Sequence, residues 1–199
     1  MLKINCASSS LISEETVNRE ALMQDIKNGD EKIYPASMTK VMTALVAIEN
    51  MENLDTVITI EDYDLEGLWE AGASVANFEV GERVSYRDLV HGIILPSGAD
   101  ACRATARVLF GSEEAMVEQM NEKAQELGLT GTHFVNTTGL HDDNHYTTVL
   151  DMLKITLYAR QRSDYCPFME SKTFCSNCKV HCYKPDMREQ IRVVMRYSA

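Results

Sequence analysis

The sequence predicts an α+β fold in which helices predominate. Several segments repeat their apolar residues with helical spacing, and the short apolar runs that form strands are few. The 199 residues suffice for one large domain or two small ones. A composition of 45% hydrophobic and 25% charged residues is ordinary for a globular protein and excludes a disordered chain.

Helices are predicted over about residues 37–48, 85–95, 100–110 and 112–127, and from Thr147 or Thr148 to about residue 160. The first helix is apolar or small around most of its circumference, so we expect it to be buried. Ser85 with Asp88 is typical of a capping box, and Ser112 is typical of an N-cap. Gly128 is expected to end the helix that Ser112 begins.

Strands are expected at residues 57–60 and around residues 9–13, where apolar and polar residues alternate. Asn28-Gly29-Asp30 predicts a turn. Glycine and polar residues over 67–81 and 134–145 predict irregular loops.

The net charge of −11, from 19 Lys and Arg against 30 Asp and Glu, excludes two classes of partner. A nucleic-acid binder needs a basic face, and docking on anionic lipid needs a polybasic patch. The apolar runs are far shorter than the roughly 18 residues of a membrane-spanning helix, so no span is expected. Residues 1–13 lack the apolar segment of a secretory signal, so none is predicted.

The strongest chemical signal is Ser37-Met38-Thr39-Lys40, at the start of the helix predicted to be buried. Residues three apart share a helical face, so Ser37 and Lys40 point into one space. A serine nucleophile needs a base within reach, and a lysine whose pKa is lowered by burial can be that base. The helix N-terminus also offers free N–H groups to a developing oxyanion. The alternative is an N-cap serine beside a solvated lysine, because so short a motif often occurs by chance.

A second serine lies in Ser97-Gly98-Ala99-Asp100, between two predicted helices. A loop hydroxyl at Ser97 could relay a proton between the nucleophile, the lysine and a leaving amine. The alternative is a plain turn, in which Ser97 caps the next helix and Gly98 permits the bend.

Several motifs occur in a fixed order: Tyr34-Pro35-Ala36-Ser37-Met38-Thr39-Lys40, Leu95-Pro96-Ser97-Gly98-Ala99-Asp100-Ala101, Gly111-Ser112-Glu113-Glu114, Met120-Asn121-Glu122-Lys123-Ala124, Glu126-Leu127-Gly128 and Thr132-His133-Phe134-Val135-Asn136-Thr137-Thr138-Gly139-Leu140. In order and spacing, from about residue 8 to residue 172, the chain resembles the serine D-alanyl-D-alanine carboxypeptidases, the low-molecular-weight penicillin-binding proteins. The resemblance implies the β-lactamase/transpeptidase-like fold, an antiparallel sheet flanked by helices. We expect this chain to be truncated at its C-terminus, so that the sheet is incomplete.

The resemblance also implies the catalytic roles. Ser37 would attack the carbonyl carbon of the penultimate D-Ala in a peptidoglycan stem peptide, Lys40 would be its base, and Ser97 would help to protonate the departing D-Ala. Gly98 and Ala99 would contribute to substrate binding. β-Lactams, which mimic the D-Ala-D-Ala end, would acylate Ser37. No cofactor and no metal is implied, and the family acts outside the cytoplasm, in the cell envelope.

The chain departs from the family pattern at three points, one of which is that no signal sequence is visible although the family is exported. Ala99 stands where the second motif usually has Asn, and the sequence contains no Lys-Thr-Gly triad, which in the family binds the substrate carboxylate. The alternative function is therefore an inactive, truncated penicillin-binding-like fragment. An incomplete sheet would leave an exposed strand edge through which the chain could self-associate.

Residues 1–174 are predicted to be the N-terminal part of the carboxypeptidase catalytic domain. Residues 175–199 are predicted to be a divergent Cys-rich tail that is unstructured or foreign to the family. Cys175, Cys178, His181 and Cys182 are plausible Zn²⁺ ligands, but structural zinc sites take two separated ligand pairs. A small zinc-binding protein built around the tail is a third functional hypothesis. A disulfide within the tail is a further alternative.

The histidines at 133, 141 and 145 surround the 134–145 loop, and their irregular spacing favours a solvated loop over a metal site. Arginines expected to be surface charges are Arg83, Arg87 and Arg103.

Overall fold

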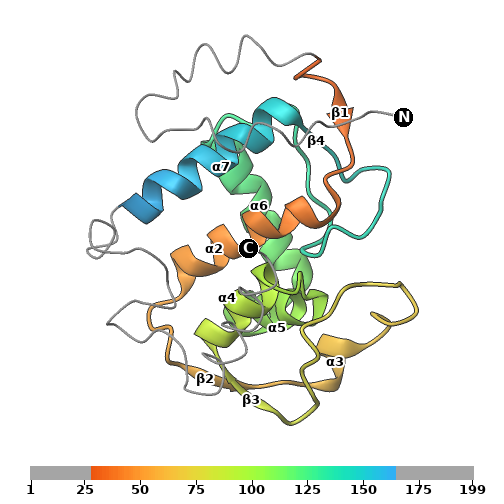
Figure 1. The fold of residues 1–199 in the computed structure, drawn as a ribbon, viewed down its shortest axis with the longest axis vertical. Coiled ribbons are helices and arrows are strands. Elements are labelled where there is room, and N and C mark those ends of the chain that lie inside the picture. Colours follow the sequence, from red (N-terminus) through yellow and green to blue (C-terminus); the bar gives the residue numbers. More distant parts are fainter. Residues whose placement is uncertain (1–27, 165–199) are drawn as a thin grey trace, which may run out of the picture. The chain divides into compact units, whose positions relative to one another are not determined.

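The computed structural model describes residues 28–164 (Figure 1). The chain divides into two units, Met1–Leu157 and Tyr158–Ala199. The described elements lie in the first unit, except for the end of the last helix, which continues into the second. The expected strand around residues 9–13 and the expected tail over residues 175–199 lie outside the described residues, so both stay predictions.

The described helices are the 3-10 turn η1 (Ala36–Met38), α2 (Thr39–Asn50), α3 (Asp62–Leu65), α4 (Tyr86–Ile94), α5 (Ala99–Phe110), α6 (Glu113–Glu126) and α7 (Val149–Asp164). The described strands are β1 (Lys32–Ile33), β2 (Val57–Thr59), β3 (Arg83–Ser85) and β4 (Thr147–Thr148). They form two antiparallel pairs, β1 with β4 and β2 with β3. The prediction of a mainly helical α+β fold with little antiparallel sheet is confirmed.

Helix α2 contacts α4, α5 and α6, and Figure 1 shows it crossing the middle of the first unit. Its buried residues are Thr39, Lys40, Met42, Thr43, Ala44, Leu45, Val46 and Ala47. A helix that is apolar or small on nearly all sides is stable only when neighbouring elements cover it. The prediction of a buried helix is confirmed. The α-helix proper begins at Thr39, and Ser37 lies in the preceding 3-10 turn.

Two apolar clusters pack the helices on which the candidate site rests. One contains Ala44 of α2, Ile93 of α4, and Ala101 and Cys102 of α5. The other contains Ile60, Val84, Leu89 and Ala104, and joins the β2–β3 pair to α4 and α5. Removing this apolar surface from water is the main stabilising contribution to such a fold, at about 25 cal/mol for each Å².

The predicted helix starts are confirmed where a side chain caps the helix. The Ser85 hydroxyl accepts from the Asp88 N–H and the Asp88 carboxylate accepts from the Ser85 N–H, which forms the expected capping box of α4. The Ser112 hydroxyl accepts from the Ala115 N–H and caps α6. The turn at residues 28–30 and the irregular segment at residues 67–81 are also confirmed.

The predicted start of the last helix at Thr147 or Thr148 is wrong. These two residues form β4, which pairs with β1, and the helix begins at Val149. The Thr148 hydroxyl accepts from the Asp151 N–H at 3.1 Å, so this threonine caps the helix from the strand. None of the helices within residues 28–164 has the length and apolar character needed to cross a bilayer.

Candidate active site

Ser37 lies in the turn η1, immediately before α2, and is exposed. Ala36 precedes it with φ +48, a left-handed conformation that is strained for an alanine. The Met38 N–H donates to the Pro35 carbonyl at 3.1 Å and closes the turn. The hydroxyl of Ser37 is therefore within reach of a ligand from solvent, beside a fixed and strained backbone.

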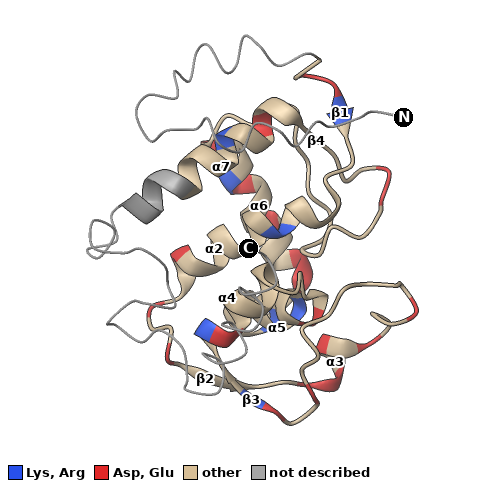
Figure 2. Ribbon diagram, in the orientation of Figure 1, with Lys and Arg blue, Asp and Glu red and all other residues tan. Residues whose placement is uncertain are grey.

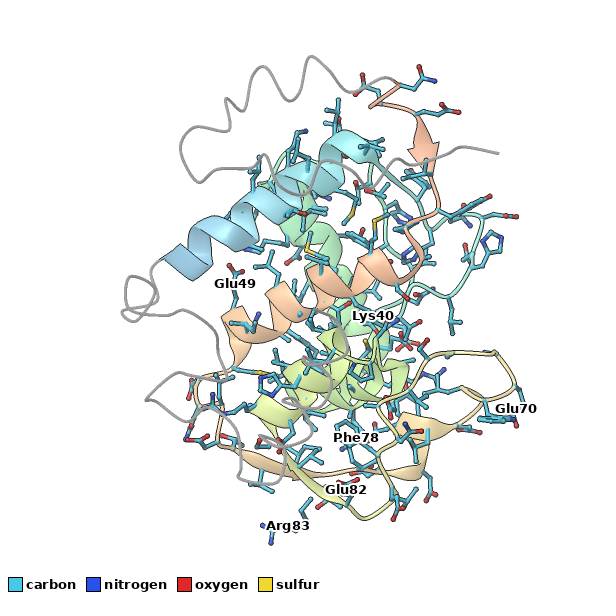
Figure 3. The ribbon with its side chains drawn as sticks, in the orientation of Figure 1. Lys40, Glu49, Glu70, Phe78, Glu82 and Arg83 are labelled. Carbon is cyan, nitrogen blue, oxygen red and sulfur yellow. The ribbon has the colours of Figure 1, made fainter. Side chains whose placement is uncertain are left out.

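Lys40 lies one turn further on, in the first turn of α2, and is only 5% exposed (Figure 3). Burial lowers the pKa of its ammonium group, and the nearby Cys102 and Asp100 of α5 act in the opposite direction. The alternative of a solvated lysine is thus wrong. A buried lysine with a lowered pKa more readily takes the neutral form that a general base needs.

The Lys40 ammonium donates a hydrogen bond to the Thr138 carbonyl at 2.5 Å. Thr138 belongs to the loop over residues 134–145, and this loop also lies against the serine turn. A Cβ added at Gly139 would collide with the carbonyl oxygen of Ala36 and lie 3.1 Å from the Ser37 nitrogen. One loop therefore contacts both the lysine and the backbone of the serine.

The prediction of a solvated loop holds for residues 141–144, which are exposed, but is wrong for His145, which is 2% exposed. Its Nδ1 accepts from the Val135 N–H at 3.2 Å, so in the neutral ring Nε2 carries the proton and donates to the Thr39 hydroxyl at 2.8 Å. Burial lowers the pKa of His145 to about 4. The histidine thus fixes the end of the loop to the first turn of α2 as a neutral side chain.

Ser97 lies between α4 and α5 and has φ +61, again unusual for a residue other than glycine. Its hydroxyl oxygen is buried and has no hydrogen-bond partner among the described residues. Buried polar atoms are nearly always paired, and backbone strain gathers at functional sites. Both features occur together at Ser97, and a plain capping turn explains neither.

Gly98 and Ala99 are buried, and their N–H groups are already engaged. Gly98 donates to the Gly92 carbonyl and Ala99 to the Ser74 carbonyl, both at 2.8 Å. Their expected contribution to substrate binding stays a prediction. It would have to come from atoms other than these two N–H groups.

Asp100 is fully buried and anchors the segment on the other side of this loop. Its carboxylate accepts from the N–H groups of Ala76 at 2.7 Å, Phe78 at 3.2 Å and Ala101 at 2.9 Å. Three backbone donors satisfy a buried carboxylate. The negative charge beside Lys40 is therefore held in a fixed place.

The structure brings Lys40 to Asp100 and Cys102 of α5, just after the Ser97 loop. Within residues 28–164 no hydrogen bond joins Ser37, Lys40 and Ser97 to one another, and the hydrogen bond of Lys40 goes to the Thr138 carbonyl. The residues that sequence reasoning missed are the partners of this lysine. A main-chain carbonyl leaves no signature in a sequence, and the Asp100 contacts join segments far apart along the chain.

The expected surface arginines differ in their placement. Arg83 is exposed and points away from the fold (Figure 3). Arg87 pairs with Asp55 at 3.1 Å. The Arg103 side chain is 23% exposed, close to the 26% of Arg87; it faces Glu113 at 3.6 Å and donates to the Glu66 carbonyl.

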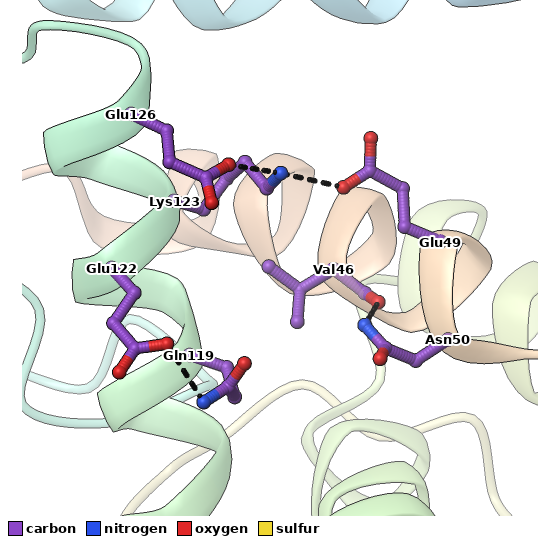
Figure 4. Close-up of a pocket in the computed structure, with 7 residues that line it drawn as sticks. All are labelled: Val46, Glu49, Asn50, Gln119, Glu122, Lys123 and Glu126. Atoms are coloured by element: carbon purple, nitrogen blue, oxygen red, sulfur yellow. Dashed lines mark hydrogen bonds and ion pairs between the residues drawn. The ribbon is translucent and has the colours of Figure 1, made fainter.

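A polar hollow between α2 and α6 lies apart from the candidate catalytic residues (Figure 4). Its lining residues are Val46, Glu49, Asn50, Gln119, Glu122, Lys123 and Glu126. Lys123 bridges Glu49 at 2.9 Å and Glu126 at 2.5 Å, which ties the two helices together. Within the described part of the chain, no three His, Cys, Asp or Glu side chains gather in a way that could hold a metal ion.

Comparisons with known proteins agree with this arrangement. The family model described as D-alanyl-D-alanine carboxypeptidase matches residues 6–184, so the protein belongs to this family of serine peptidases. The chain is 40% identical over 126 residues to the D-alanyl-D-alanine carboxypeptidase DacF of Bacillus subtilis, covering 63% of this chain and 32% of that protein. It is 36% identical over 135 residues to the D-alanyl-D-alanine carboxypeptidase DacC of Escherichia coli, covering 63% of this chain and 33% of DacC.

Among solved structures, penicillin binding protein 6B from Escherichia coli matches with a TM-score of 0.65 and 30% identity, over 68% of this chain and 44% of that one. The fold is therefore the penicillin-binding, transpeptidase-like fold that the sequence predicts. The chain spans about a third of the length of DacF and DacC, at 32% and 33%.

Proposed function

We propose that this chain carries the acylating residues of a serine D-Ala-D-Ala carboxypeptidase. The reaction is removal of the terminal D-Ala from a peptidoglycan stem peptide, through an acyl-enzyme on Ser37. The observation that supports this most directly is an exposed serine followed, three residues later, by a buried lysine with a lowered pKa. Family membership supports the same reaction.

In the proposed first step, the Ser37 oxygen bonds to the carbonyl carbon of the penultimate D-Ala while its proton passes to neutral Lys40. The Ser37 N–H, at the start of the helix, stabilises the oxyanion that forms. The bond from this carbon to the nitrogen of the terminal D-Ala then breaks. The departing amine takes up the proton, and the unpartnered Ser97 hydroxyl is the group that passes it on.

In the second step, water attacks the ester on Ser37, and the shortened peptide leaves as a carboxylic acid. Lys40 takes the proton of the attacking water, and Ser37 recovers its own. β-Lactams acylate the same oxygen, and the resulting ester marks the nucleophile. We place the protein in the cell envelope, where its substrate is found. Self-association through a sheet edge stays a prediction, to be checked by sedimentation.

Release of D-Ala from a synthetic peptide that ends in D-Ala-D-Ala tests the proposal. Ser37→Ala and Lys40→Met should each lower the rate at least about 100-fold, the usual contribution of a nucleophile or its base. Ser74→Ala is the matched control, since Ser74 is exposed and only its carbonyl is engaged, and it should keep the wild-type rate. A folded wild-type chain that releases no D-Ala contradicts the proposal and favours an inactive binding fragment.

A further inference from the structure

Asn136 lies in the loop that contacts Lys40, and its side-chain amide makes four hydrogen bonds within that loop. Its Oδ1 accepts from the N–H groups of Thr138 at 3.2 Å and Gly139 at 2.7 Å, and from the Thr138 hydroxyl at 3.2 Å. Its Nδ2 donates to the Leu140 carbonyl at 2.9 Å. This one side chain therefore fixes the conformation of the loop at the point where Lys40 binds.

The geometry of one peptide group connects Asn136 to the lysine. The Thr138 carbonyl and the Gly139 N–H belong to the same planar trans peptide, so they point in opposite directions. Asn136 Oδ1 binds the N–H end at 2.7 Å, and Lys40 Nζ binds the carbonyl end at 2.5 Å. Hydrogen bonds in such a chain polarise one another, and the first bond sets the direction of the second.

We propose that Asn136 is a positioning residue for Lys40, which acts by orienting the Thr138–Gly139 peptide so that its carbonyl holds the lysine ammonium. The inference rests on the proposed function of Lys40 as the base. Within residues 28–164 no hydrogen bond joins Asn136 to Lys40, so we expect its effect on the lysine to pass through this peptide group.

Other contacts hold the loop in place without Asn136. Glu113 accepts from the N–H and the hydroxyl of Thr137 at 2.9 and 2.7 Å, and His145 bonds to Thr39. The charged and titratable groups that face Lys40 from α5, Asp100 and Cys102, belong to a separate element. Loss of Asn136 should therefore change the orientation of one peptide group and leave the surrounding structure intact.

The test measures Lys40 itself, by NMR titration of ¹³C-labelled lysine side chains, with the Lys40 signal assigned from Lys40→Met. In Asn136→Ala the ammonium loses its oriented acceptor, so the pKa of Lys40 should fall by about one pH unit. In Asn136→Asp the three acceptor contacts remain and a negative charge is added, so the pKa should rise. The added charge alone can cause the rise in Asn136→Asp, so the fall in Asn136→Ala, set against the control variant below, carries the test.

Asn121→Ala is the matched control, because Asn121 also binds backbone near this loop. Its amide donates to the Phe134 carbonyl at 2.8 Å and accepts from the Phe134 N–H at 2.9 Å. This variant should lower stability and leave the pKa of Lys40 unchanged. If Asn136→Ala does not fold, Asn136→Leu, which is close in size to Asn and also lacks the acceptor oxygen, is titrated in its place.

An unchanged pKa in folded Asn136→Ala, equal shifts in Asn136→Ala and Asn121→Ala, or an unchanged or lowered pKa in Asn136→Asp would each overturn the inference. Acylation by a fluorescent penicillin, followed in parallel, should slow at least about tenfold in Asn136→Ala and stay within about threefold in Asn121→Ala. If the wild-type chain is not acylated at all, the proposed function fails, and the titration still decides the role of Asn136.

Discussion

Two residues of the candidate site have backbone conformations that L-amino acids rarely adopt. Ala36, beside the proposed nucleophile Ser37, has φ +48, and Ser97 has φ +61. Such a conformation costs on the order of 1–2 kcal/mol for a residue with a Cβ. The other described non-glycine residues with positive φ are Asn28 and Asn77, a residue type that tolerates this region well. The strained backbone at Ala36 and Ser97 therefore lowers stability at the two places where it fixes the position of a candidate site residue.

Gly139 is the residue whose size matters most beside this strained turn. It has φ +79, and a Cβ at this position would collide with the Ala36 carbonyl. We predict that Gly139→Ala lowers the free energy of unfolding by more than about 2 kcal/mol, since both the backbone strain and the collision must be relieved. Urea denaturation measures this loss, and acylation of Ser37 should fall with it.

Gly111→Ala separates the effect of backbone strain from the effect of the collision. Gly111 has φ +86 at the end of α5, but nothing lies within 4 Å of the added Cβ. This variant should lose only about 1 kcal/mol and keep acylation. Equal losses in the two variants would show that close packing against Ala36 is not what requires the glycine.

At the level of elements, Arg107 joins α5 to the short helix α3, around which acidic residues gather along the chain (Figure 2). It binds both oxygens of Asp64, at 2.9 and 2.7 Å, and Asp64 is fully buried. We predict that Arg107→Ala costs about 3–5 kcal/mol, because it leaves a buried carboxylate with the Glu61 N–H but without its cationic partner. Chemical denaturation of the variant measures the cost.

The pair of Arg87 and Asp55 offers a comparison, since the Asp55 side chain is 78% exposed whereas Asp64 is fully buried. Arg87→Ala should cost less than about 1 kcal/mol. A small loss in Arg107→Ala, similar to that of Arg87→Ala, would mean that α3 is held mainly by other contacts.

The sequence predicts the helices well because their signals are local. The capping box at Ser85, the cap at Ser112 and the apolar pattern of α2 all lie within the segments that they define. The short strands β1 and β4 were not predicted. Each has two residues and forms only because the other lies beside it, and no local pattern records a partner so distant in sequence.

At the level of the whole molecule, His145 couples stability to pH. Its pKa of about 4 in the folded chain lies below the ordinary value of 6.5. Between these pH values the unfolded chain binds more protons, so stability is full above about pH 6.5 and falls as the pH drops toward 4. We predict a loss of up to roughly 3 kcal/mol over this range, measured by denaturation at several pH values.

Two variants assign this loss to the buried ring. His145→Gln should flatten the dependence between pH 6.5 and 4. His141→Gln should leave it unchanged, because the His141 side chain is 66% exposed. The same steep dependence in His145→Gln would show that other groups cause it.

As with the fold, only those parts of the candidate site that have a local sequence pattern could be predicted from the sequence. Ser37, Lys40 and Ser97 could be proposed from the sequence because their chemistry resides in side chains with fixed spacing. The Thr138 carbonyl and the buried contact of His145 with Thr39 could not, because they depend on how the 134–145 loop lies against α2. The sequence therefore predicts which groups react, and the structure adds what positions them.

The most direct test of the central claim is the mass of the intact protein after exposure to a fluorescent penicillin. We predict that the wild-type chain gains one covalent adduct, that Ser74→Ala gains it equally, and that Ser37→Ala gains none. A folded wild-type chain without an adduct, or an adduct that persists in Ser37→Ala, would contradict the assignment of Ser37 as the nucleophile.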